Sequence, residues 1–367
     1  MTNNHVTVLE IDAKALAHNL NYFKQKLQPT TKILAVVKAF GYGSDGVKVS
    51  KFLQDKVDYF AVAYAHEGIA LREANVKTPI LVLHPQIPNL QSIVDYKLEP
   101  NLYNFKIFDA FLTLADEIPL MNYPVHIKFN TGLNRLGFWH SDIPKIIESL
   151  HKNNHVKVQS LFSHLAASED LEEKDFTINQ LNNFAYIAKQ FYKYLDYKPM
   201  LHILNTSGVV NYAQAQFDMV RVGIGLYGFG NDDKETAELK NTHNLKSIIS
   251  QIHLIEPGET VGYNRAFVAK KHSKTATIPV GHADGLSRKL GNKNGYVLIN
   301  NQKAKIIGNV CMDMIMVDVT KIDCKEGDEV IIFNNQEMLN HISKVSETIV
   351  YETLTAISQR VKKMLKK

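Results

Sequence analysis

Eight short strand-like runs alternate with helix-like segments between about residues 12 and 230, and this alternation constrains the fold more than any other feature. Most of the runs are rich in aliphatic and β-branched residues, as expected of strands buried on both faces. They span residues 33–38, 59–63, 79–84, 98–103, 125–130, 158–164, 201–205 and 219–225. Eight such strands separated by helices predict an α/β fold with a (β/α)8 barrel, and an open doubly wound sheet is the alternative.

The segments between the strands show helical periodicity. Asp12 can cap a helix in which Leu16, Leu20, Phe23 and Leu27 share one face. A second apolar stripe, with helical spacing, predicts a helix over residues 172–195.

The pattern changes after about residue 240, where alternating apolar and polar residues are separated by tight-turn signals such as Glu256-Pro257-Gly258. This pattern predicts a mainly antiparallel β domain. We expect a barrel over residues 12–235 and the β domain over 236–367, joined by the polar stretch 230–241. Residues 1–11 contain a strand that could pair with the β domain.

Composition narrows the class of protein. The formal net charge is +5 with both signs interspersed, which argues against a nucleic-acid-binding face. Only two cysteines occur, without metal-ligand spacing, so neither a metal nor a disulfide framework is expected. The sequence has no signal-peptide pattern and no apolar run of about 18 residues. These features predict a soluble, cytoplasmic protein with no membrane association.

Polar side chains stand at the carboxyl ends of the predicted barrel strands, where the active sites of such barrels are built. They are Lys38, Lys128, Asn130, His164, Asn205 and Arg221. A lysine among apolar neighbours favours a Schiff base, because burial lowers the amine pKa. Tyr42 and Gly223, each beside glycine-rich turns, suit a phosphate group. Taken alone, each of these residues is also explained by a purely structural role, either as a solvated strand end or as part of a tight turn.

The chain resembles the alanine racemase family at these residues and along almost its whole length. "AVVKAFGYGSDG" around Lys38 is similar to the family's pyridoxal-phosphate lysine motif. Further matching stretches come in family order: "IKFNTGLNRLGF", "LFSHLAAS", "LHILNTSG", "MVRVGIGLYG", "VGYNRAF", "IPVGHADG" and "GNVCMDMIMVDV". The family's architecture, a barrel followed by a β domain, agrees with the independent prediction.

The resemblance implies a two-base reaction. Lys38 would hold pyridoxal 5'-phosphate covalently and act as one base, and Tyr263 of the partner subunit would act as the other, in a homodimer with shared active sites. Opposed bases on the two faces of the substrate α-carbon explain inversion. A tyrosine is a poor base at its usual pKa of about 10, so its surroundings must stabilise the phenolate.

Other roles also follow from the resemblance. His164 and Arg221 would link Tyr263 to the cofactor ring, with Arg221 bonded to the pyridine nitrogen. The implied cofactor-binding residues are Lys38, Tyr42, Asn205, Thr206, Arg221, Gly223 and Ile224. Arg135 and Met312 would bind the substrate, and Lys128 is the position that is carbamylated in this family.

The sequence departs from the family pattern at several positions. Gln359 stands where a phosphate-side tyrosine is expected in an "ISYR"-like motif, and His282 and Asn309 replace an entry-corridor tyrosine and arginine. Further departures are Phe40, Ser44 and Asn130. Loss of an aromatic gate could admit side chains larger than methyl.

The leading hypothesis is an alanine racemase that supplies D-alanine for peptidoglycan. A racemase of broader range, acting on serine or larger amino acids, is the first alternative. A basic amino-acid decarboxylase shares the architecture but favours an acidic partner for the pyridine nitrogen, whereas Arg221 stands here. A pyridoxal-phosphate carrier protein lacks the β domain that contains Tyr263.

Overall fold

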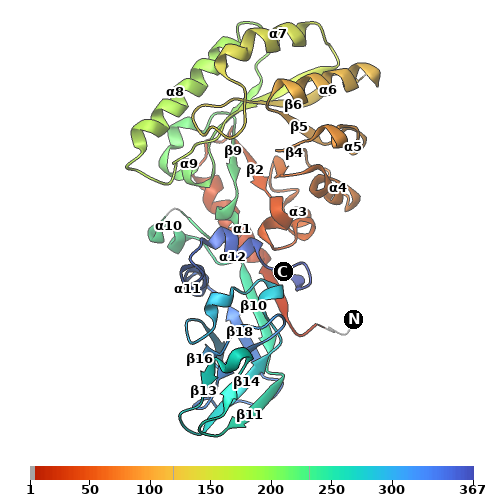
Figure 1. Cartoon of the computed structure of the whole chain (residues 1–367). Helices are drawn as coiled ribbons and strands as arrows, with labels where there is room; N and C mark the ends of the chain where they lie inside the picture. Colours follow the sequence, from red (N-terminus) through yellow and green to blue (C-terminus); the bar gives the residue numbers. More distant parts are fainter. Residues whose placement is uncertain (1–4, 119, 231) are drawn as a thin grey trace.

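The structure of the 367-residue chain is a computed structural model that describes residues 5–118, 120–230 and 232–367. Figure 1 shows two parts stacked along one long axis: an eight-stranded sheet surrounded by helices and, below it, a domain of long strands.

The first part is a parallel barrel in the strand order β8-β7-β6-β5-β4-β3-β2-β9. Its strands are β2 (Lys32–Val36), β3 (Tyr59–Val62), β4 (Ile80–Val82), β5 (Glu99–Leu102), β6 (Tyr123–Lys128), β7 (Val156–Phe162), β8 (Met200–His202) and β9 (Met219–Val222). Backbone hydrogen bonds from Asp218 to Leu201 and from Arg221 to Leu204 join the two edges of the sheet. The eight predicted strands and the (β/α)8 prediction are therefore confirmed.

Helices cover the outside of this barrel and connect its strands (Figure 1). They are α1 (Ala13–Gln25), α2 (Lys38–Tyr42), α3 (Gly46–Leu53), α4 (Ala65–Glu73), α5 (Leu90–Asp95), α6 (Phe105–Glu117), α7 (Ile143–His151), α8 (Lys174–Phe191) and α9 (Thr206–Asn211). A further helix, α10 (Asp233–Glu238), follows the last barrel strand and lies between the two parts. Asp12 caps α1 as predicted, because its carboxylate accepts hydrogen bonds from the backbone N–H groups of Lys14 and Ala15.

The second part is built on a nine-stranded, mostly antiparallel sheet in the order β11-β14-β17-β16-β15-β18-β10-β1-β19. Its strands are β1 (Val8–Asp12), β10 (His243–Ile248), β11 (Gln251–Ile255), β14 (Ser273–Ile278), β15 (Tyr296–Ile299), β16 (Gln302–Ile307), β17 (Ile315–Asp318), β18 (Glu329–Phe333) and β19 (Lys362–Lys366). A separate ribbon pairs β12 (Thr260–Val261) with β13 (Phe267–Val268). The prediction of a mainly antiparallel β domain is confirmed.

The chain crosses between the two parts more than once. The N-terminal strand β1 pairs antiparallel with β10 and parallel with β19, before the chain enters α1 of the barrel. Two late helices, α11 (Gln336–Ser346) and α12 (Val350–Thr355), lie at the junction with the barrel (Figure 1). The Cβ of an alanine at Gly43 in α2 would lie 2.1 Å from the carbonyl oxygen of Leu354 in α12, so these two helices are in close contact. The junction therefore lies beside the end of β2 where Lys38 stands.

Among the described residues there is neither a helix suited to span a membrane nor a cluster suited to bind a metal ion. None of the helices in the described ranges is long and apolar enough to cross a membrane. In the same ranges, no cluster of histidine, cysteine and acidic side chains could hold a metal ion.

Candidate active site

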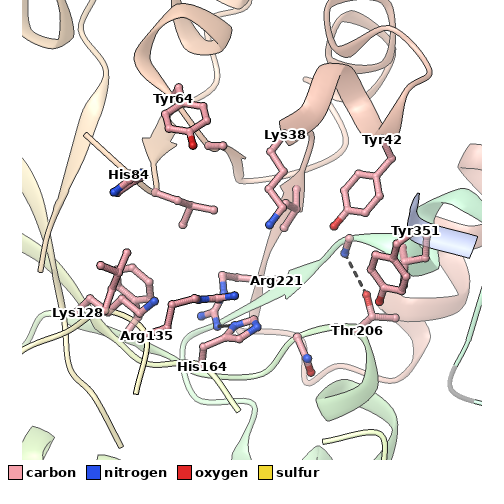
Figure 2. Close-up of a pocket in the computed structure, with 18 residues that line it drawn as sticks. Lys38, Tyr42, Tyr64, His84, Lys128, Arg135, His164, Thr206, Arg221 and Tyr351 are labelled. Atoms are coloured by element: carbon pink, nitrogen blue, oxygen red, sulfur yellow. Dashed lines mark hydrogen bonds between the residues drawn. The ribbon is translucent and has the colours of Figure 1, made fainter. Parts of the chain in front are cut away.

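A cavity of about 410 Å³ opens at the carboxyl ends of the barrel strands. Figure 2 shows Lys38, Tyr42, Lys128, Arg135, His164, Thr206 and Arg221 around it. It is also lined by Asn205, Gly223 and Ile224. The structure thus brings together the predicted site residues of the barrel, except Asn130, which does not line the cavity.

Lys38 enters this cavity from an unusual turn. It stands two residues after the end of β2, and the next three residues, Ala39, Phe40 and Gly41, have positive φ angles of 53°, 55° and 67°. Left-handed backbone is unfavourable for residues with a Cβ, so the surrounding contacts must stabilise this turn. One such contact is a 3.3 Å hydrogen bond from the Phe40 backbone N–H to Glu67.

The Lys38 amine lies among other cations. Burial and the positive charges of Arg135 and Arg221 lower the pKa of Lys38, against the opposing effect of the Glu67 carboxylate. A larger part of the amine is therefore neutral, and hence nucleophilic and basic, than for an exposed lysine.

Opposite Lys38, hydroxyl groups and glycines form a small polar concavity. Thr206 Oγ1 accepts a 3.0 Å hydrogen bond from the backbone N–H of Gly223. A Cβ at Gly223 would lie 2.4 Å from the Tyr42 hydroxyl, so only glycine lets the backbone approach this closely. Asn205 caps α9 by accepting a 2.9 Å hydrogen bond from Gly208 N–H. The hydroxyl groups of the concavity are donors that suit a phosphate group.

Arg221 is buried below the cavity and is hydrogen bonded on several sides. Its Nη2 donates to His164 Nδ1 at 3.1 Å and to the Ser163 carbonyl at 2.7 Å, and its Nη1 donates to His202 Nδ1 at 2.7 Å. Burial lowers the pKa of Arg221 to about 9, which leaves it cationic at neutral pH.

His164 is neutral in this environment. Burial, together with the charges of Arg221 and Lys128, lowers the pKa of His164 well below its usual value. Because Arg221 can only donate, His164 Nδ1 is the acceptor, and its Nε2 carries the proton.

The electrostatics of the cavity are strongly positive. Burial, with the charges of Arg221, Arg135 and Lys38, lowers the pKa of Lys128 to about 7. Among the described residues that line the cavity there is no aspartate or glutamate. A ligand with anionic groups would offset these charges.

Two predicted site residues, Tyr263 and Met312, lie outside this cavity, as do the nearby departures His282 and Asn309. Tyr263 and Met312 are 72% and 58% exposed on the β domain. Asn309 donates a 3.1 Å hydrogen bond to the Tyr263 carbonyl, and the backbone of His282 donates to the carbonyl of Cys311. These residues therefore lie on one exposed face, and this chain's own cavity contains none of them.

Tyr351 in α12 was not predicted as a residue of the site. Tyr351 lines the cavity beside Thr206, with its ring centroid 6.1 Å from that of Tyr42 (Figure 2). Gln359 instead lines a separate cleft with Phe40 and His66. Gln359 therefore replaces the tyrosine of the "ISYR"-like motif, while Tyr351 lies beside Tyr42 and Thr206 in the cavity.

Tyr64 and His84 at the ends of β3 and β4 also line the cavity without having been predicted. Their rings lie 5.6 Å apart. Among the other departures, Ser44 bonds to buried His243 at 2.6 Å and Asn130 donates to Asn134 at 2.8 Å, so both make local contacts.

Comparison with known proteins identifies the family. Residues 11–230 match the alanine racemase N-terminal domain and residues 242–365 match its C-terminal domain. The chain belongs to the alanine racemase family. It is 35% identical to alanine racemase of Thermodesulfovibrio yellowstonii and 36% identical to that of Fusobacterium nucleatum, over 96% and 98% of this chain and 96% and 99% of those proteins.

Solved structures of the family share the whole architecture. Alanine racemase of Clostridium difficile 630 superposes with a TM-score of 0.92 at 33% identity, over 98% of this chain and 95% of that one. Alanine racemase from Bartonella henselae, described with covalently bound pyridoxal phosphate, superposes with a TM-score of 0.86 at 28% identity, over 99% and 100% of the two chains. The predicted family is confirmed.

Proposed function

We propose that this chain is a pyridoxal-phosphate-dependent racemase that interconverts L- and D-alanine with two bases, Lys38 and Tyr263 of the partner subunit. As a homodimer in the cytoplasm it would supply D-alanine for peptidoglycan. Family membership supports the substrate, since the relatives above are named alanine racemases.

The residues of the cavity fit pyridoxal phosphate. Gly223, Thr206 and the hydroxyls of Tyr42 and Tyr351 form the concavity that would hold the phosphate. Partial burial and the charge of Glu169 raise the pKa of Tyr351 to about 12, so its hydroxyl stays protonated and can donate. When bound, the cofactor acidifies the substrate α-carbon by withdrawing electrons.

Arg221 would face the cofactor ring as a donor. In the described chain its hydrogen bonds use Nη1 and Nη2, which leaves Nε–H for a group in the cavity. A guanidinium does not give its proton to the ring nitrogen, so the electron-withdrawing power of the ring stays moderate. Moderate withdrawal disfavours side reactions such as transamination.

The two bases approach the substrate from different directions. The lowered pKa of Lys38 lets its amine take or return a proton on one face. Tyr263 is exposed, so it can reach into the open cavity of a second copy. There the Nε2–H of His164 could donate to its phenolate oxygen and stabilise it. Arg135 and the exposed Met312 would hold the substrate carboxylate.

One observation supports this function above the others: Lys38 and Arg221 share a cavity without acidic lining residues in the described chain. To test it, the purified protein with pyridoxal phosphate and L-alanine is incubated in D2O. We expect D-alanine, and exchange of the α-proton for deuterium. Lys38→Ala should reduce both by at least about a thousandfold, whereas the exposed Lys56→Ala control should not change them.

The alternatives give other results. Release of carbon dioxide and an amine would indicate a decarboxylase. A bound, coloured cofactor without α-deuterium exchange by the wild-type protein would indicate a carrier protein.

A broader substrate range is the second candidate. His282, which stands where the resemblance implies an aromatic gate, lies next to Met312, because the backbone N–H of Ala283 donates to the Met312 carbonyl at 2.9 Å. Measuring the racemisation rates of L-alanine and L-serine side by side would test it, since similar rates indicate a broad range. A His282→Tyr variant should shift the ratio of the two rates towards alanine.

A further inference from the structure

A chain of hydrogen bonds crosses the inside of the barrel from Arg221 to the buried carboxylate of Glu99. Its links are Arg221 Nη1 to His202 Nδ1 (2.7 Å), His202 Nε2 to Ser160 Oγ (2.8 Å), Ser160 Oγ to His126 Nδ1 (2.6 Å) and His126 Nε2 to Glu99 Oε2 (2.7 Å). We call these five residues the Arg221–Glu99 chain.

Five successive strands, β5 to β9, contribute one residue each to the Arg221–Glu99 chain. All five are less than a tenth exposed, and His126, Ser160 and His202 are fully buried. Buried polar groups must be paired, so these residues form a specific arrangement in the barrel core.

The two ends fix the first and last hydrogen bonds, and the two bonds between them follow when each imidazole carries one proton. Arginine can only donate and a carboxylate can only accept, so His202 Nδ1 and Glu99 Oε2 are acceptors. Burial, with the charge of Arg221, lowers the pKa of His202 well below its usual value, so this ring is neutral and donates from Nε2 to Ser160. Ser160 then donates to His126 Nδ1, and His126 donates from Nε2 to Glu99. All donors point towards Glu99.

Arg221 lacks a direct counter-charge. Within the described part of the chain its guanidinium donates only to neutral groups, which are two histidine nitrogens and the carbonyls of Ser163, His202 and Ile203. A buried cation without compensation is costly. Aligned hydrogen bonds strengthen one another in a low-dielectric interior, so they can transmit the effect of a distant carboxylate.

We propose that Glu99 is a positioning residue that supplies the counter-charge of Arg221 through His202, Ser160 and His126 and so holds the guanidinium in place under the cofactor site. The inference rests on the role of Arg221 in the proposed function. Tyr59 stacks edge-on against His126 with ring centroids 5.9 Å apart, and Arg72 is the nearby cation at the Glu99 end.

The direction of the hydrogen bonds can be observed by neutron diffraction from crystals of the deuterium-exchanged holoenzyme. We expect deuterium on Nε2 alone in both His126 and His202, and the Ser160 deuteron directed at His126. Deuterium on both nitrogens of His126, or a protonated Glu99, would reverse the Ser160 bond and overturn the proposal. This measurement does not depend on which reaction the enzyme catalyses.

A double-mutant cycle tests the effect on the reaction. Glu99→Gln keeps an acceptor for His126 but removes the charge, and Ser160→Ala interrupts the Arg221–Glu99 chain in the middle. We expect each variant to lower kcat about tenfold with little change in KM, as supporting residues of active sites commonly do. The double variant should resemble Ser160→Ala alone within about twofold, because Glu99 acts only through Ser160.

The control is Ser50→Ala, which removes another buried hydroxyl, one without a hydrogen-bond partner in the described chain. It should leave kcat unchanged.

Two results would overturn the proposal. One is a loss of kcat in the double variant that equals the product of the two single losses, and the other is an unchanged kcat in folded Glu99→Gln. If Glu99→Gln does not fold, the comparison of Ser160→Ala with Ser160→Thr decides: only the threonine should retain activity. A wild-type enzyme without racemase activity would instead contradict the proposed function.

Discussion

At the scale of single residues, the site is a group of buried cations whose basic side chains are less protonated than usual. Burial and mutual repulsion lower the pKa values of both Lys38 and Lys128. Arg221 keeps its proton and is held by hydrogen bonds instead. The same positive environment therefore favours the neutral form of both amines more than water does, and it leaves Arg221 as a fixed cation.

The lowered pKa of Lys128 predicts carbamylation by carbon dioxide. Only the neutral amine reacts, and its fraction rises as the pH rises through about 7, whereas an exposed lysine stays protonated up to a pH of about 10. With ¹³C-labelled bicarbonate, ¹³C NMR should show a carbamate signal that grows between pH 6 and pH 8 and is lost in Lys128→Met. A wild-type protein without this signal at pH 8 would refute the prediction.

Replacing Tyr263 by phenylalanine should remove one base and leave the cofactor bound. We expect racemisation to fall by at least about a thousandfold in at least one direction, with normal visible absorbance of the cofactor. Tyr186→Phe, at a similarly exposed position on α8, is the control and should be fully active. Unchanged rates in both directions for Tyr263→Phe would show that it is not a base.

At the scale of elements, the contacts between α2, α12 and the turn after β9 shape the phosphate side. Tyr42 lies in the left-handed turn of α2, Tyr351 comes from α12, and Gly223 follows β9. Each element alone is short, so the concavity depends on their packing against one another. A side chain added at Gly223 should therefore affect binding more than folding.

Gly223→Ala should lower the affinity for pyridoxal phosphate by about tenfold, because the new methyl group would displace the Tyr42 hydroxyl that lies 2.4 Å from the Cβ position. Gly327→Ala is a matched control: its Cβ would meet open space but its φ is +90°, so it should lose about 1 kcal/mol of stability and no affinity. Fluorescence titration of the apoenzyme measures both affinities. Equal affinity of Gly223→Ala and wild type would contradict this account.

Sequence patterns predicted the barrel strands because each is a short apolar run whose end is marked by a polar residue such as Lys38 or His164. They did not predict Tyr351, because a tyrosine in a short helix of the β domain has no periodic signal that directs it to a barrel mouth. Glu99 and His126 were missed for another reason. Each stands within a strand run, and only the closed barrel shows that their side chains meet inside it.

At the scale of the whole molecule, the proposed catalytic groups are divided between the two parts of the chain. The barrel contains the cavity with Lys38 and Arg221, and the β domain presents Tyr263 and Met312 on an exposed face. A domain boundary between residues 235 and 236 stays a prediction, and the family models support it because one ends at residue 230 and the next begins at residue 242. Such a division fits a head-to-tail pair in which each face completes the other copy's cavity.

Mixing two inactive variants tests this shared site most directly. Lys38→Ala lacks the first base and Tyr263→Phe lacks the second. After subunit exchange, each mixed dimer has one cavity with an intact Lys38 and the tyrosine of the other chain. Random mixing should therefore restore about a quarter of the wild-type activity. If mixed dimers form, as tags on the two variants would show, and no activity returns, the claim that each site uses residues of both subunits is contradicted.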